Sequence, residues 1–172
     1  MFERTGGQVT LSPDSVAQTQ GPVLELGVEE LRDSLRTILF NLDSGLEDLP
    51  DGTMRIAYNS TAVFVDVSAQ VLGESVVRSL VTIASPVLRD VVVSPPLCEW
   101  VATQGWRYVF GHVTLDALMG TGRIEFQHRL LGEHLGADEF EQAVLAVVGT
   151  ADQLVETMQA RFGGLRYTDL SV

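Results

Sequence analysis

The chain has 172 residues, of which 45% are hydrophobic, and a formal net charge of -12. This length suffices for one domain with a proper core, and the composition is ordinary for a soluble globular protein. The acidic excess argues against nucleic acid or an anionic membrane surface as the main partner. All 11 basic residues are arginine, a bias that codon usage in a GC-rich genome explains.

The single cysteine, Cys98, excludes a disulfide within the chain and a cluster of thiolate metal ligands. We therefore expect a reducing, cytoplasmic location. Beside Trp100, this cysteine is predicted to be a small buried hydrophobe. Residues 1–21 lack the features of a signal peptide. No apolar run approaches the roughly 18–20 residues that span a bilayer, so no membrane insertion is expected.

Residues 1–22 are rich in Gly, Gln, Ser, Thr and Pro and poor in large apolar groups. Such a segment cannot bury enough surface to offset its ordering entropy, which predicts a flexible N-terminal arm. The remainder, residues 23–172, is expected to form a single domain. Its first helix is predicted over 28–42, because one stripe of that segment carries Leu31, Leu35, Ile38, Leu39 and Leu42.

Strands are predicted next, over 54–58, 63–71 and 76–84. Alternating valines in the second strand indicate one apolar face. Ser85-Pro86 is expected to interrupt the third strand, because proline cannot donate a hydrogen bond to a ladder. Val91-Val92-Val93 is a candidate continuation on an edge.

A short helix over 97–103 follows, with Ser94 as its candidate N-cap and two prolines suited to a first turn. A hairpin is then predicted from Arg107 to Leu131, with its turn at Met119-Gly120-Thr121-Gly122. Both of its arms alternate apolar and polar residues, which is typical of an antiparallel pair with one wet face.

One long amphipathic helix is predicted over 137–162, with a left-handed cap at Gly163-Gly164. The element order is therefore α-βββ-α-ββ-α. It predicts an α+β fold in which helices pack on an antiparallel sheet of about five strands. The helix carries a stripe that either packs on the sheet or forms a dimer seam: Val144, Val147, Leu154 and Met158.

The histidines offer the main catalytic or metal-binding alternative. His112 and His128 lie on facing strands of the hairpin, where nearby carboxylates would complete an acid–base or metal site. No tight ligand spacing such as His-Glu-x-x-His accompanies them. A Walker phosphate loop is impossible without lysine. We therefore predict no catalytic residues, metal or cofactor.

Two segments carry a resemblance to a known family. The first runs from Leu97-Cys98-Glu99-Trp100-Val101 through Tyr108-Val109-Phe110-Gly111-His112-Val113, and the second from Ala151-Asp152-Gln153-Leu154 through Arg161-Phe162-Gly163-Gly164. From Val28 to Gly164 the chain resembles YbjN-like proteins, within the class of type III secretion chaperone-like folds. The resemblance implies an α+β fold, a tendency to dimerise, and a non-enzymatic role in binding peptides or regulating another protein.

We therefore expect a homodimeric chaperone-like or regulatory adaptor that binds a protein or peptide partner at a sheet edge or an exposed sheet face. Large strand side chains are candidate contacts and equally candidates for the core: Tyr58, Phe64, Tyr108, Phe110 and Phe126. The alternative is a small-molecule-sensing regulatory domain with a ligand cavity between the sheet and the C-terminal helix.

Overall fold

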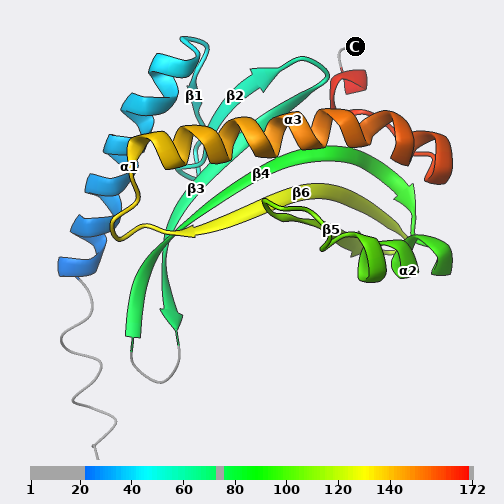
Figure 1. Cartoon of the computed structure of the whole chain (residues 1–172), viewed down its shortest axis with the longest axis horizontal. Coiled ribbons are helices and arrows are strands. Elements are labelled where there is room, and N and C mark those ends of the chain that lie inside the picture. Colours follow the sequence, from blue (N-terminus) through cyan, green and yellow to red (C-terminus); the bar gives the residue numbers. More distant parts are fainter. Residues whose placement is uncertain (1–21, 73–75, 171–172) are drawn as a thin grey trace, which may run out of the picture.

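In the computed structural model, residues 22–72 and 76–170 are described, and this part of the chain forms a six-stranded antiparallel sheet with the long C-terminal helix along one face (Figure 1). The strand order is β1-β2-β3-β4-β6-β5. In chain order the elements are α1 (Pro22–Leu42), β1 (Glu47–Asp48), β2 (Met54–Tyr58), β3 (Thr61–Leu72), β4 (Val76–Val92), α2 (Pro95–Gln104), β5 (His112–Leu118), β6 (Thr121–Leu131), α3 (Ala137–Phe162) and the 3-10 helix η2 (Tyr167–Leu170).

The predicted α+β fold is confirmed, with the helices and strands in the expected order. The sequence did not predict β1, which adds one strand to the expected five. This strand is two residues long, so it offers no alternation to detect. It pairs with β2, where Glu47 lies opposite Arg55 and forms a salt bridge with it.

The core lies between the sheet and α3, which runs along β4 and β6 in Figure 1. The helix buries residues spaced three and four apart: Phe140, Ala143, Val144, Val147, Val148, Ala151, Leu154, Val155 and Met158. They meet inward side chains of the strands, among them Val65 and Ile83, and α1 adds Leu35 and Leu39. Each buried Val, Leu or Phe contributes roughly 1.5–3 kcal/mol, so this interface dominates the stability.

β4 continues through Pro86, where the sequence predicted an interruption, and ends at Val92. The pairing of β3 with β4 reaches only as far as Phe64 opposite Ala84. A strand tolerates proline where no neighbour needs its N–H, which explains the failed prediction. Register shifts between Pro86 and Leu88 and between Leu88 and Val91 accompany the arch of β4 in Figure 1.

The predicted hairpin is confirmed as β5 and β6, and its turn residues Met119 and Gly120 have φ values of 51° and 89°. Two consecutive positive φ values are typical of a tight type I′ turn. The first arm begins later than predicted, at His112. Gly111, with a φ of 79°, is the last residue of the loop of residues 105–111 that precedes β5.

The helix ends follow from local sequence. α3 has the predicted bounds, and the N–H of Gly163 bonds the carbonyl of Gln159 at its end. α2 has a proline in its first turn, but the side chain of Ser94 makes no cap hydrogen bond. Cys98 is exposed on α2, whose buried residue is Leu97, so its predicted burial was wrong.

The N-terminal helix begins earlier than predicted, since α1 starts at Pro22. The rest of the predicted arm, residues 1–21, lies outside the described residues. None of the described helices combines the length and the apolar character needed to cross a bilayer.

Candidate partner-binding surface

The sheet face turned away from α3 carries polar and apolar side chains in one row. Residues paired across neighbouring strands point to the same side. The strand registers align Arg55, Phe64, Ala84, Gln127 and His112 in this row. The adjacent row, which includes Met54, Val65 and Ile83, is buried against the helices. We call the face with the mixed row the open face.

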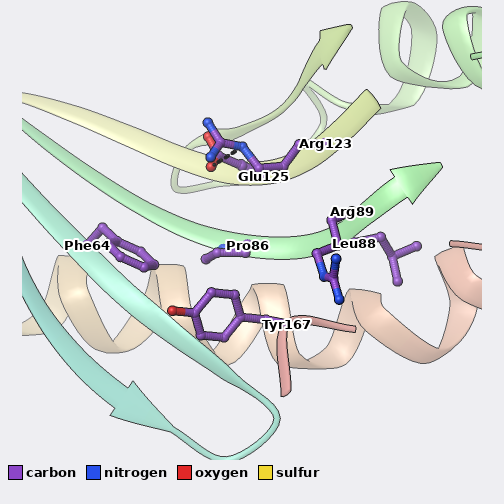
Figure 2. Close-up of a pocket in the computed structure, with 7 residues that line it drawn as sticks. All are labelled: Phe64, Pro86, Leu88, Arg89, Arg123, Glu125 and Tyr167. Carbon is purple, nitrogen blue, oxygen red and sulfur yellow. Dashed lines mark ion pairs between the residues drawn. The ribbon is translucent and has the colours of Figure 1, made fainter. Parts of the chain in front are cut away.

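A hollow of about 250 Å³ lies on the open face, and we call it the β4 hollow (Figure 2). Its lining combines apolar and charged side chains from β3, β4, β6 and η2: Phe64, Pro86, Leu88, Arg89, Arg123, Glu125 and Tyr167. In Figure 2, Pro86 lies between the aromatic pair of Phe64 and Tyr167 and the ion pair of Arg123 and Glu125. An apolar floor with charged flanks can hold an amphipathic ligand group.

The C-terminal segment reaches the open face through a short bridge to β4. Arg89 and Leu165 exchange two backbone hydrogen bonds, each 2.9 Å long. Tyr167 then packs edge-on against Phe64, with ring centroids 5.9 Å apart. Arg55 Nε donates to the Tyr167 hydroxyl at 3.2 Å. The chain therefore already pairs Leu165 with the backbone of β4 and seats one aromatic ring on this face.

The two arginines of the β4 hollow are neutralised to different extents. Arg123 Nε donates to Glu125 at 2.9 Å, and its guanidinium lies 3.8 Å from Asp116. Arg89 Nη1 pairs with Asp90 at 2.8 Å, but Arg89 Nε is buried and has no hydrogen-bond partner among residues 22–72 and 76–170. Leaving a buried N–H unpaired costs about 1–3 kcal/mol, so this position favours an incoming oxygen acceptor.

The aromatic residues predicted as partner contacts are dispersed. Phe64 lines the β4 hollow, whereas Tyr58 and Phe110 are 39% and 50% exposed elsewhere. Tyr108 is half-buried with its ring 5.1 Å from that of Phe126, and burial raises the pKa of its hydroxyl. Phe126 is fully buried. Of the two alternatives predicted for it, Phe126 therefore takes the core position, because the alternation of β6 turns its side chain toward α3.

A second exposed apolar group lies in the loop of residues 105–111. Trp106 is 65% exposed and Val109 is 92% exposed, beside Phe110. The loop leads into β5, the last strand of the sheet order, whose outer edge pairs with no described strand. Sequence reasoning missed Val109 because it extended the strand through the loop. A glycine at 111 within the alternating pattern was the available signal.

The α3 stripe, which was predicted either to pack on the sheet or to form a dimer seam, packs on the sheet. Val144, Val147, Leu154 and Met158 are all at most 9% exposed and belong to the core under α3. These side chains fill the space between α3 and the sheet. The alternative function, small-molecule sensing, would need a ligand cavity in this same space between α3 and the sheet. The β4 hollow lies instead on the opposite face of the sheet.

His112 and His128 lie on neighbouring strands but belong to different faces. His112 pairs with Gln127 in the open-face row, whereas His128 pairs with the inward Ile83. The pKa of His128 is lowered, mainly by burial and further by the nearby His112. Among residues 22–72 and 76–170, no group of three or more His, Cys, Asp or Glu side chains is placed to hold a metal ion.

Comparisons with known proteins point in one direction. The model of the TY-Chap1 family, described as type III secretion (YopN, CesT) and YbjN peptide-binding chaperone 1, matches residues 29–170. The crystal structure of the ExsC–ExsE complex contains a similar chain with 15% identity and a TM-score of 0.51. That match covers 75% of this chain and 93% of the other, and shows a shared fold. No curated protein sequence matches the chain.

Proposed function

The chain belongs to the TY-Chap1 family of type III secretion and YbjN peptide-binding chaperones, and from this we propose that it binds an extended segment of a partner protein. The open face with its β4 hollow carries the proposal, because it joins an apolar floor to a buried, unpaired donor. An extended peptide that crosses a sheet face can place alternate side chains in pockets of that face. The similar solved structure is itself a complex, of ExsC with ExsE.

The proposed role is non-enzymatic and cytoplasmic. Peptide binding, the role in the family's description, needs no catalytic group. The lone cysteine is exposed on α2, which suits a reducing compartment. Fractionation of native cells, with detection by antibody, is expected to recover the protein in the cytoplasmic fraction.

Selection from a phage-displayed library of random short peptides tests the peptide-binding proposal. The full-length chain is expected to enrich peptides whose affinity is then measured by fluorescence anisotropy. Ala84→Arg fills the centre of the open face, between Phe64 and Gln127, and should weaken binding at least tenfold, roughly 1.4 kcal/mol. Ala102→Arg, the same change at an exposed position of α2, should leave the affinity unchanged.

Two results would contradict this proposal. One is a selection that enriches no peptide on the full-length chain. The other is equal peptide affinity for the wild type and for Ala84→Arg, provided that circular dichroism shows both to be folded.

We further propose that the protein is a homodimer in which the loops of residues 105–111 and the β5 edges of two copies meet. Trp106, Val109 and Phe110 expose apolar surface beside a strand edge that no other described strand pairs with. Such an edge is a ready template for pairing with another chain, and burying the loop against its own copy removes apolar surface from water.

Light scattering coupled to size-exclusion chromatography tests the dimer. The expected mass is about twice the 18.7 kDa of one chain. Val109→Glu should shift the protein to the monomer mass. Met119→Glu, at the equally exposed hairpin tip, should remain dimeric. A monomeric wild type, or a dimer that survives Val109→Glu, would remove this part of the proposal.

A further inference from the structure

A second hollow borders the β4 hollow. It encloses about 290 Å³ and shares Arg89 and Arg123 with the β4 hollow. The other lining residues of the second hollow are Asp90, Asp116, Thr121 and Gly122. The linings of the two hollows therefore change from apolar side chains at Phe64, through two shared guanidinium groups, to carboxylates near the tip of the hairpin.

The β4 hollow is slightly smaller than a typical small-molecule site. Small-molecule sites typically enclose about 300–1,000 Å³, whereas this hollow encloses about 250 Å³. Its lining includes the buried Pro86 and Leu88 and the rings of Phe64 and Tyr167, which pack edge-on against each other. A large apolar side chain placed there would lie against two aromatic rings.

Arg89 supplies a polar anchor beside this apolar site. Its backbone is held by Leu165 and its Nη1 by Asp90. Its Nε is buried without a partner, although the side chain as a whole is 28% exposed and can be reached. A guanidinium in a partly dry site binds carboxylates more strongly than neutral acceptors.

We infer that the β4 hollow takes a large apolar side chain of the bound segment, and that Arg89 binds a carboxylate two residues away along the same segment. This inference rests on the proposed peptide-binding function. Residues two apart in an extended chain point to the same side and lie about 6.5 Å apart. Tyr167, which lines the apolar part of the hollow, is itself two residues from Leu165, the backbone partner of Arg89. One side chain of the bound segment would therefore enter beside Tyr167 while the other meets Arg89. The net charge of -12 disfavours a wholly acidic segment, so the carboxylate is a local feature of a neutral or basic one.

The peptide selection, run in parallel on the wild type, Arg89→Gln and Arg78→Gln, tests the inference. Arg78 is an exposed arginine of the same strand that lines neither of the two hollows, and it provides the matched control. The wild type and Arg78→Gln should both enrich Asp or Glu two residues from a large apolar residue. Arg89→Gln should retain the apolar preference and lose the acidic one.

One enriched peptide then gives the size of the effect. Replacing its acidic residue by the corresponding amide should weaken binding to the wild type about tenfold. The same replacement should change binding to Arg89→Gln less than about twofold. If Arg89→Gln does not fold, the acid-against-amide comparison on the wild type still decides, and equal affinities there overturn the inference.

The failures of the two proposals are distinguishable. Enriched peptides without an acidic preference, or with the same preference on Arg89→Gln, overturn the inference and leave peptide binding standing. A selection that enriches no peptide on any of the three proteins overturns both.

Discussion

The two faces of the sheet come from the same strands but are completed in different ways. On the α3 side, β6 contributes Ile124 and Phe126, both fully buried. On the open face, the alternate residues Arg123 and Glu125 pair with each other at the border of the β4 hollow. Because strand side chains alternate with period two, packing and partner binding can be encoded at interleaved positions of one strand.

Matched phenylalanines on the two faces of the sheet test whether the faces contribute differently to stability. Phe126→Ala should lower the free energy of unfolding by about 3–5 kcal/mol, because it removes a fully buried ring from the core. Phe64→Ala, on the half-buried open face, should cost less than about 2 kcal/mol. Urea titrations of both variants measure the difference. Equal midpoint shifts would mean that the open face is as much a core as the α3 side.

Gly111 is where the chain passes from the exposed loop into β5, and it tests how closely that loop is held. A Cβ at this position would lie 2.3 Å from the carbonyl oxygen of Gln127, on a backbone with a φ of 79°. Gly111→Ala should therefore cost about 2–4 kcal/mol. Gly120→Ala has a similar φ of 89° but open space around the Cβ, so it should cost only about 1 kcal/mol. Thermal unfolding of the pair would refute this account if the two losses were the same.

Thr61 lies where β3 leaves β4, at the border between the α3 side and the open face. It provides a further test of how the two faces differ in stability. Its buried hydroxyl donates to the carbonyl of Pro86 at 2.6 Å and lies 3.2 Å from the hydroxyl of Ser85. Thr61→Val should cost about 1–2 kcal/mol, because it leaves that carbonyl unpaired. Thr82→Val, on the half-exposed open-face side of β4, should stay within about 0.5 kcal/mol of the wild type. Chemical denaturation decides, and a neutral Thr61→Val would show that the hydroxyl pairing is dispensable.

Local patterns were enough for the elements that local signals define. The stripe of α3 and its glycine stop predicted both of its bounds, and Met119-Gly120 predicted the hairpin turn. The continuation of β4 through Pro86 was not predictable from proline chemistry alone. It depends on where β3 stops pairing, which is a property of a different strand.

The candidate site was only partly predictable for a related reason. Alternation shows that a strand has two faces, but it does not say which face meets a helix, and this is how Phe126 was chosen with Phe64. The β4 hollow joins Phe64, Arg89, Arg123 and Tyr167 from three strands and the C-terminal segment. No spacing in the sequence links these residues, so only the folded chain could bring Arg89 and Tyr167 to attention.

His128 provides the smallest test, since it is a polar ring in the row that points to the α3 side. Burial is the main cause that lowers its pKa below the ordinary value of 6.5, His112 lowers it further, and Glu139 acts in the opposite direction. The unfolded chain therefore binds the proton more readily than the folded one. The stability linked to this group is complete above about pH 6.5 and is lost as the pH falls through the folded-state pKa.

His128→Gln should remove that part of the acid destabilisation, measured as the shift in urea midpoint between about pH 7.5 and about pH 5. His134→Gln, at an exposed position between β6 and α3, controls for the loss of one histidine. An unchanged shift in His128→Gln would mean that the ring is as well solvated as it is in the unfolded chain. Water would then reach the α3 side of the sheet at His128, although the paired residue Ile83 is fully buried.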